Sequence, residues 1–577
     1  MRLGQKSSKK IGYEPFPMLI GNFHSLFLCN FSTKRIKSCT IKVSNPKSQE
    51  LFFMHKNYNM KQVILPLDLE IMMPEDDICF AIHELIESMP EEKFTTFKQE
   101  TGRPSLHPRM MLKLILCAYT QSMFSGRKIE NALQDSIRMM WLAQGETPSY
   151  RTINRYRVHP LMAPIIQDCF VQFRNLLVQE NLIDETAIFI DGTKLEANAN
   201  KFTFVWKKSI QRFSDALIEK SKALYQELLS NEIIPAIEID NQAELSTQEL
   251  MVIEDELSQA VETLTQEIDK ESNGQKRKAL RSQRKPIKLA RKQVANFILR
   301  KEKYKLDFEI MGARNSYSKT DIDATFMRMK DDYMRNGQLK AAYNLQIATE
   351  NQYVLDYEVY PNPTDTRTLP DFLAHYQNKY QQLPDYIIAD AGYGGEENYQ
   401  TVLETYQRTP LITYNAYEKE QKRKFKKDLF KTANWPYDPE QDYFICPNHQ
   451  KVTYRYESHR TDKYGLTRDL KIYECEDCQG CPVRKSCTRA KSDNNRQLQI
   501  NPKWESFKLT IKELLSEKET GKLYGKRKID VEPAFARLKA NLGFSRFSVR
   551  GKDKVRQEIG LALMAINLRK LMVTCRT

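Results

Sequence analysis

The stretch Asp184-Glu-Thr-Ala-Ile-Phe-Ile-Asp191-Gly192-Thr-Lys-Leu-Glu-Ala-Asn-Ala-Asn-Lys-Phe202 decides how the rest of the chain is interpreted. Its apolar run, 187–190, is rich in strand-forming residues and predicts a buried strand that ends on Asp191, with Gly192 in a turn at its exit. A carboxylate at the end of a buried strand is costly without a partner. A divalent cation is one suitable partner, and an Asx turn that closes the strand is the alternative.

Length and composition limit the class of protein. The 577 residues exceed a single core and predict several domains. Hydrophobic residues make up 41% and charged residues 28%, as in a folded soluble protein. The net charge of +15 suits a nucleic-acid partner, although ribosomal or membrane-surface binding would explain it equally well. No run of 18 apolar residues occurs, so we expect no membrane partner and a cytoplasmic, nucleoid-associated protein.

Two further carboxylates have settings that complement Asp191. The apolar run 386–389 ends on Asp390, and Glu532 lies early in a predicted helix, on one stripe with Lys539. Two strand-end aspartates could lie on neighbouring strands, and a helix packed on the sheet could supply the third acid. Such a cluster repels itself unless hard cations such as Mg²⁺ (or Mn²⁺) lie between the oxygens. Two ions held in this way can clamp a phosphodiester for in-line displacement.

Five of the eleven cysteines fall within 42 residues, which favours a metal site over disulfides in a long chain without a clear secretory signal. The Cys-x2-Cys spacings suit tetrahedral Zn²⁺. Reduced thiols without metal are the alternative. The predicted zinc ligands are Cys446, Cys475, Cys478 and Cys487, with Cys481 or His449 as alternates.

The N-terminal half is predicted to be helical. Residues 1–61 are expected to be disordered or to precede the functional start, and 62–180 to form an all-helical DNA-binding domain. Within it, the segment 148–157 suits a recognition helix in a major groove, with a solvated helix face as the alternative. The basic side chains predicted to contact DNA there are Arg151, Arg155 and Arg157.

Two insertions are expected to interrupt an α/β core formed by 181–204 and 312–430. Residues 205–311 predict a helical hairpin whose acidic arm precedes Asn273 and whose basic arm follows it. The two arms could pair with each other, or the basic arm could contact DNA phosphates. Residues 431–500 form the Cys-rich insertion, and 501–577 the C-terminal helices that carry Glu532.

Several motifs together resemble those of DDE transposases of bacterial insertion sequences, over about 62–572. The chain departs from the family pattern in having four residues instead of three between the arginine and the glutamate, so either Arg527 or Lys528 could fill the arginine's role. The segments that carry the resemblance are Asp191-Gly-Thr-Lys-Leu-Glu-Ala-Asn-Ala-Asn200, Ile388-Ala-Asp390-Ala-Gly-Tyr-Gly394, Tyr524-x2-Arg527 with Glu532-x6-Lys539, Gly102-Arg-Pro104, Arg127-Lys-Ile-Glu130 and Thr152-Ile-Asn-Arg-Tyr-Arg157.

The resemblance implies an RNase H-like α/β core with an all-helical N-terminal domain, a helical hairpin insertion and a small Cys-rich, zinc-ribbon-like insertion. It implies hydrolysis at the element's terminal inverted repeats, followed by attack of the freed 3′-OH on target DNA. Asp191, Asp390 and Glu532 would hold two metal ions. The side chains expected to contact DNA near the cut are Lys194, Tyr393, Tyr524, Arg527, Lys528 and Lys539.

The need to bring two DNA ends together predicts a homodimer or higher assembly. Two other functions fit the same residues: a non-catalytic DNA-binding protein descended from such an enzyme, and an RNase H-like nuclease that cuts DNA without joining it.

Overall fold

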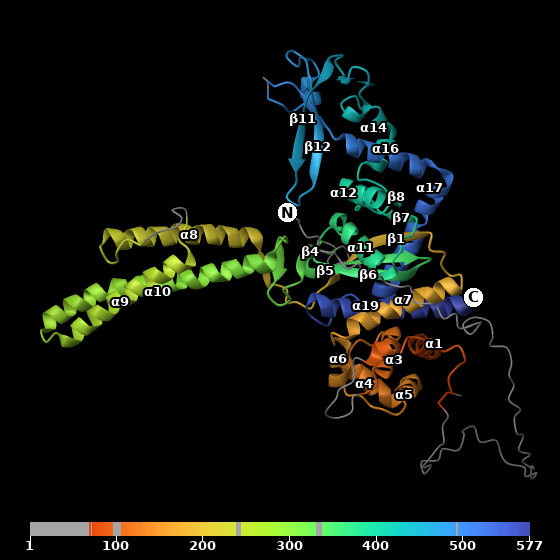
Figure 1. Ribbon diagram of the computed structural model, residues 1–577, viewed down its shortest axis with the longest axis horizontal. Helices are drawn as coiled ribbons and strands as arrows, with labels where there is room; N and C mark the ends of the chain where they lie inside the picture. Colours follow the sequence, from red (N-terminus) through yellow and green to blue (C-terminus); the bar gives the residue numbers. More distant parts are fainter. Residues whose placement is uncertain are drawn as a thin grey trace, which may run out of the picture.

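The computed structural model describes residues 69–70, 72–95, 106–237, 244–329, 337–491 and 494–576. The segment 1–61 and the motif Gly102-Arg-Pro104 lie outside these residues. Figure 1 shows a central α/β body with a helical layer below it, a β-rich lobe above it and a long helical arm to one side.

The N-terminal region is helical, as predicted. The longest segment of its core is α3, which is buried from Met111 to Thr120 and begins where the His107 ring accepts a hydrogen bond from the Arg109 amide. The helices are α1 (Ile78–Glu87), α2 (Glu92–Thr95), α3 (Pro108–Thr120), α4 (Gly126–Asp135), α5 (Ile137–Ala143), α6 (Tyr150–Arg157) and α7 (Met162–Gln179).

A mixed sheet forms the centre of the molecule, in agreement with the predicted α/β class. Strand β1 is antiparallel to β5 and parallel to β7, and β7 is parallel to β8. On its other side β5 pairs antiparallel with β6 and β4. The strands are β1 (Ala187–Glu196), β4 (Thr325–Arg328), β5 (Leu339–Glu350), β6 (Tyr353–Tyr360), β7 (Tyr386–Ala389) and β8 (Thr409–Ile412). Asn351 and Gln352 join β5 to β6 with φ angles of 47° and 63°, the left-handed conformation that a two-residue hairpin loop requires.

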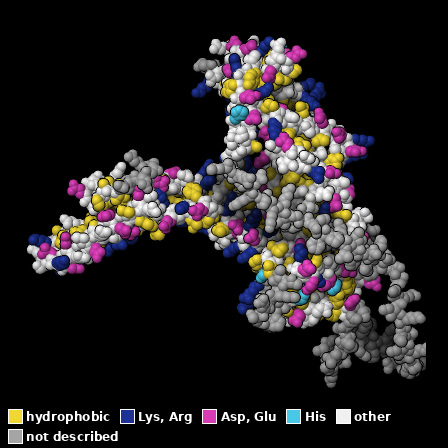
Figure 2. All heavy atoms as spheres, in the orientation of Figure 1, with side chains coloured by type: hydrophobic (Ala, Val, Ile, Leu, Met, Phe, Trp, Pro, Cys, Tyr) yellow, Lys and Arg dark blue, Asp and Glu magenta, His cyan; other side chains and the backbone are white. Residues whose placement is uncertain are grey.

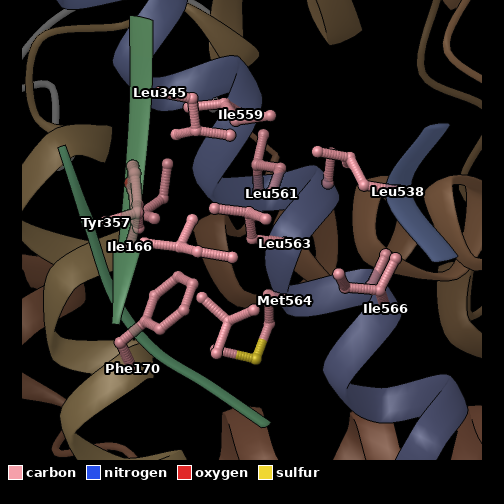
Figure 3. Close-up of a cluster of buried hydrophobic side chains, with 14 of the residues drawn as sticks. Ile166, Phe170, Leu345, Tyr357, Leu538, Ile559, Leu561, Leu563, Met564 and Ile566 are labelled. Atoms are coloured by element: carbon pink, nitrogen blue, oxygen red, sulfur yellow. The ribbon is translucent and has the colours of Figure 1, made fainter. Parts of the chain in front are cut away.

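The C-terminal helix α19 (Lys552–Arg576) connects the helical layer to the sheet. Its buried segment from Ile559 to Leu568 packs between α7 and the sheet, and Figure 3 shows these side chains meeting Ile166 and Phe170 of α7 and Leu345 and Tyr357 of the sheet. One continuous hydrophobic core therefore holds the helical region and the sheet together. The remaining helices of this body are α11 (Leu369–Tyr380), α12 (Glu396–Gln400), η2 (Thr401–Thr405), α16 (Pro502–Ser516), α17 (Lys518–Gly525), α18 (Arg527–Ala536) and the π-helical turn η4 (Arg537–Asn541).

The arm is made of three long helices, so the predicted two-helix hairpin is wrong in number. They are α8 (Lys207–Ser230), α9 (Thr247–Lys270) and α10 (Gly274–Met311). The third helix contributes to the apolar core of the arm. Tyr225 and Leu228 of α8 pack there with Leu257 of α9 and Val294 of α10. Short strands β2 (Phe204–Trp206) and β3 (Ser316–Ser318) pair at the base of the arm.

The Cys-rich segment forms a separate five-stranded antiparallel sheet in the order β13-β12-β11-β10-β9. Strands β11 and β12 form its long hairpin. The strands are β9 (Tyr437–Asp438), β10 (Tyr443–Ile445), β11 (Lys451–Thr461), β12 (Thr467–Cys475) and β13 (Gln497–Ile500), and α15 (Arg484–Cys487) lies beside them. No helix in the described part of the chain is long and apolar enough to cross a membrane.

Candidate active site

Asp191 and Asp390 lie side by side because they follow matched residues on two parallel strands. The last pair between β1 and β7 is Ile190 with Ala389, so both aspartates come next at the same level of the sheet. Oδ1 of Asp191 accepts a hydrogen bond from the Gly192 amide at 2.7 Å, and Oδ1 of Asp390 accepts one from the Gly392 amide at 2.8 Å.

The expected end of the first strand at Asp191 is wrong, and so is the turn at Gly192. Strand β1 continues to Glu196 because β5 pairs with it as far as Ala342. Gly192 is instead a place of close approach. A Cβ there would lie 2.3 Å from Nε2 of Gln346 and 2.5 Å from Oδ1 of Asp365, far inside van der Waals contact.

The environment of Asp191 disfavours its charged form. Burial, followed by the negative charge of Asp390, raises the pKa of Asp191 to about 6. Arg527 opposes this shift, with its Nη1 3.4 Å from Oδ2 of Asp191. Arg527 is thus the basic residue whose charge favours the ionised form of Asp191.

Asp365 is a third carboxylate at this place, and it was missed in the sequence. It lies in the loop after β6, and its Oδ1 accepts hydrogen bonds from Asn344 Nδ2 at 2.7 Å and Gln346 Nε2 at 2.9 Å. Its Oδ2 and Oδ1 of Asp390 both lie beside Gly392, 3.9 and 2.9 Å from the position of a Cβ on that glycine. An aspartate soon after a predicted strand was the available signal, but its Pro361-Asn-Pro-Thr setting looked like an ordinary turn.

Glu532 lies on the helix that approaches the aspartates, but its side chain is exposed and forms no hydrogen bond or ion pair with a described residue. The same helix places Arg527 on Asp191. Lys539 lies in the π-helical turn η4 and lines a cavity together with Lys194, Asn344 and Asp365. Within the described residues, no three His, Cys, Asp or Glu side chains are gathered closely enough to hold a metal ion.

The residues expected to contact DNA near the aspartates differ in their positions. Arg527 faces Asp191, whereas Lys528 is exposed. Lys194 is half-buried, and its Nζ donates to the Arg328 carbonyl at 3.2 Å. Tyr524 is half-buried, with its hydroxyl 3.0 Å from that of Thr413. The DNA contact predicted for Tyr393 is wrong, because that side chain is completely buried and donates its hydroxyl hydrogen to Gln346 Oε1.

The predicted recognition helix is α6, which Ser149 caps by accepting a hydrogen bond from the Thr152 amide. Arg151 and Arg155 are exposed on it. The DNA contact predicted for Arg157 is wrong. Its guanidinium is buried and donates to the Tyr119 hydroxyl at 3.1 Å and the Phe124 carbonyl at 2.7 Å. Arg157 follows the buried Ile153 by one helical turn, which places it on the inner face.

All five clustered cysteines line one small cavity in the β-rich lobe, together with Trp435 and Arg496. Each thiol is free of disulfide bonds. Burial, followed by a side-chain hydrogen bond with Cys478, raises the pKa of Cys475 to about 12. Arg496 donates its backbone amide to Cys478 Sγ at 3.4 Å and Nη1 to Cys487 Sγ at 2.8 Å. His449, one of the alternate ligands, is exposed and is not part of the cavity lining.

Two family models match the chain. One, described as a transposase domain (DUF772), matches residues 67–159, which span most of the N-terminal helices. The other, described as a transposase DDE domain, matches residues 445–572, which include the cysteine cavity, Arg527, Glu532 and Lys539. No curated protein and no solved structure matches the chain.

Proposed function

Since this chain belongs to the DDE transposases of insertion sequences, we propose that it binds the terminal inverted repeats of its element, hydrolyses a phosphodiester bond at each end and joins the freed 3′-OH to target DNA. One observation carries the proposal. Asp191 and Asp390 follow the last paired residues of β1 and β7, and Nη1 of Arg527, on the helix α18 that also carries Glu532, lies 3.4 Å from Oδ2 of Asp191.

The strand order supports an RNase H-like core. In the strand order β6-β5-β1-β7-β8, the pairs β6–β5 and β5–β1 are antiparallel, and the pairs β1–β7 and β7–β8 are parallel. This arrangement brings Asp191, within β1, beside Asp390 at the end of β7, where a C-terminal helix can close over both. The fold thus allows acids that are distant in sequence to serve one reaction.

The acidic residues have the donor chemistry that Mg²⁺ or Mn²⁺ prefers, namely carboxylate oxygens. Asp191, Asp390 and Glu532 would hold two ions, which when bound supply charge stabilisation to the attacking and leaving oxygens. Burial and the neighbouring charge of Asp390 raise the pKa of Asp191, and a bound cation would oppose both effects by favouring the charged carboxylate. Glu532 must turn toward the aspartates for the set to be complete, since it is exposed in the structure.

The basic side chains around the acids would hold the DNA backbone. Arg527, which lies beside Asp191, would contact a phosphate there, and Lys539 and Lys194 would contact phosphates along the adjoining cavity. On the helical layer, Arg151 and Arg155 of α6 would reach the DNA. Joining two element ends in one reaction requires a homodimer or a larger assembly.

The test is a cleavage assay on duplex DNA that carries the terminal inverted repeat, with Mg²⁺ or Mn²⁺ added. We expect Asp191→Ala and Asp390→Ala to abolish nicking, while DNA binding persists. Asp371→Asn, on the exposed face of α11, is the matched control and should cleave at the wild-type rate. Full nicking by Asp191→Ala would refute the proposed role of the aspartates.

A second assay separates transposition from simple DNA cleavage. Pre-cleaved ends with a free 3′-OH bypass the hydrolytic step, so a transposase joins them to target DNA and a nuclease does not. Joining by the wild type, and its loss in Glu532→Gln, would support the full reaction. Cleavage without joining would favour a nuclease, and DNA binding that is unchanged in EDTA without any cleavage would favour a non-catalytic protein.

We also propose that the cysteine cavity binds a structural Zn²⁺ ion. Its support is that five thiols line one small space, although they are spread over 42 residues of sequence: Cys446 follows β10, Cys475 ends β12, Cys478 and Cys481 lie in the next loop, and Cys487 ends α15. The thiols must draw closer together to bind the ion, because no three potential ligands among the described residues are close enough in this structure. Cys446, Cys475, Cys478 and Cys487 would be the ligands, with Cys481 as the alternate. Elemental analysis should find one zinc per chain, and Cys475→Ser should lose it, whereas Cys169→Ser, in the main core, should retain it. A zinc-free wild type would refute the proposal.

A further inference from the structure

The outer half of α10 carries the most concentrated charge on the arm. Residues 274–292 contain nine Lys or Arg side chains and no acidic residue. The helix is 38 residues long, or about 57 Å, and this basic run forms its outer part, beyond the turn at Asn273. Figure 1 shows the arm extending away from the central body, and Figure 2 shows Lys and Arg side chains at its far end.

Only a minority of these charges is used within the arm. Arg291 pairs with Glu254 at 3.7 Å, Arg284 donates to Thr265 Oγ1 at 2.9 Å, and Arg277 donates to the Ile268 carbonyl at 3.0 Å. The other six side chains are exposed and form no ion pair or side-chain hydrogen bond with a described residue. They are Lys276, Lys278, Arg281, Lys285, Lys288 and Lys292.

The acidic helix α9 does not neutralise this run. Asp255, Glu262, Glu267 and Asp269 of α9 are exposed and likewise form no ion pair with a described residue. The two helices are held by apolar contacts such as Leu257 with Val294 and Ile298. Charge pairing between the arms is therefore not what the basic residues accomplish.

Five of the unpaired side chains form a continuous stripe. Lys278, Arg281, Lys285, Lys288 and Lys292 follow each other at alternating steps of three and four residues, which keeps them on one face of the helix over about 21 Å. A row of cations along one helix face suits a regular polyanion, and duplex DNA carries a phosphate every 3.4 Å along each strand.

We propose that this face, the basic stripe of α10, binds the phosphate backbone of duplex DNA outside the region of the cut. The inference rests on the proposed function, because that function makes DNA the substrate. It adds a binding surface at a distance from Asp191 and Asp390. Contacts of this kind hold DNA without reading its sequence, so the stripe would act on any duplex that the core positions beside it.

The experiment compares two variants of the full chain that lose equal charge. The stripe variant replaces Lys278, Arg281, Lys285, Lys288 and Lys292 by Gln, which has nearly the helix propensity of Lys and Arg. The control variant replaces five other exposed basic residues of the arm by Gln: Lys208, Lys220, Arg300, Lys303 and Lys305. Circular dichroism and the unfolding temperature establish that both variants fold.

The readout is the affinity for a long inverted-repeat duplex over a series of salt concentrations. The logarithm of the DNA-binding constant falls with the logarithm of the salt concentration, and each lost phosphate contact reduces the steepness of this fall by about 0.9. The stripe variant should therefore show a slope shallower by roughly 3 to 4 and bind at least about tenfold more weakly at low salt. The control variant should keep most of the wild-type slope. Equal slopes for the two variants would overturn the inference.

Two further outcomes are informative. If the wild type cleaves DNA and the two variants bind DNA equally well, the DNA-binding role of the stripe is refuted and the proposed function stands. If the wild type neither binds nor cleaves DNA, the proposed function is refuted. A photo-crosslinker on Lys285→Cys should capture DNA. Capture of a second protein copy instead, with no DNA adduct, would also overturn the inference.

Discussion

Asp365 gives the acidic site a third carboxylate, and its role can be separated from its structural contacts. In Asp365→Asn the amide oxygen can still accept from Asn344 and Gln346, while a neutral NH₂ group replaces Oδ2, which lies beside Gly392. With less negative charge to attract a cation, we expect Mg²⁺ affinity in the cleavage reaction to fall roughly 10- to 100-fold. The measurement is the cleavage rate as a function of Mg²⁺ concentration.

The control for this change is again Asp371→Asn, which should leave the Mg²⁺ dependence unaltered. A wild-type Mg²⁺ dependence for Asp365→Asn would mean that Asp365 only supports the loop.

Glu350 predicts a pH-dependent loss of stability outside the acidic site. Burial raises its pKa to about 8, even though Oε1 accepts the amides of Asp184 and Glu185 at 2.7 and 3.0 Å. Since the folded-state pKa lies above the unfolded one, the folded form is favoured below about pH 4.5 and loses this advantage as the pH rises through 8. Glu350→Gln should therefore match the wild type near pH 4.5 and be roughly 1 to 3 kcal/mol more stable above pH 8.

Urea unfolding at both pH values measures this difference. Glu397→Gln, an exposed glutamate on α12, should show no such pH dependence. An equal gain for Glu350→Gln at both pH values would rule out its ionisation as the cause.

Single residues were predictable where a local pattern determines their position. The apolar runs before Asp191 and Asp390 suggested neighbouring strands, and these runs pair in parallel up to the residues before the two acids, although β1 itself continues to Glu196. The same patterns gave no information on tertiary neighbours. Tyr393 and Arg157 looked like DNA contacts because they belong to polar motifs, but the fold turns both into the interior. Asp365 was missed because its neighbours, Asn344 and Gln346, come from another strand.

At the scale of elements, the buried Asn567 of α19 forms hydrogen bonds with the backbone of the sheet, in addition to the apolar packing of this helix. Asn567 accepts from the Val354 amide at 2.8 Å and donates to the Val354 carbonyl at 2.7 Å, all within the core. Asn567→Ala leaves two buried backbone groups unpaired, so we expect the free energy of unfolding to fall by about 2 to 4 kcal/mol. Denaturant unfolding measures this, and the exposed Lys554→Ala on the same helix should change it little. A loss below about 1 kcal/mol would mean that water replaces the amide.

The arm illustrates which features of an element the sequence specifies. The sequence predicted an acidic helical arm before Asn273, and α9 is that arm, with Leu257 and Ile268 buried on one face. It did not indicate that α8 would cover α10 from another side, because periodicity defines a buried face without naming its partner.

At the scale of the whole molecule, the arm has a core of its own. The cluster of Tyr225, Leu228, Leu257 and Val294 is separate from the core that α19 shares with the helical layer and the sheet. We therefore expect the arm to unfold independently of the body. Leu257→Ala removes a completely buried side chain and should destabilise the arm by about 2 to 5 kcal/mol.

Hydrogen exchange followed by mass spectrometry resolves the two parts. In Leu257→Ala, exchange should accelerate in 207–311 and stay at the wild-type rate in β1, β5 and α19. The reciprocal control is Leu561→Ala, in the shared core, which should accelerate exchange in α7, β6 and α19 and leave the outer half of α10 unchanged. Faster exchange throughout the chain in both variants would mean that the arm and the body unfold as one unit. If they unfold separately, the basic stripe is carried on a support whose stability can be altered without disturbing the acidic site.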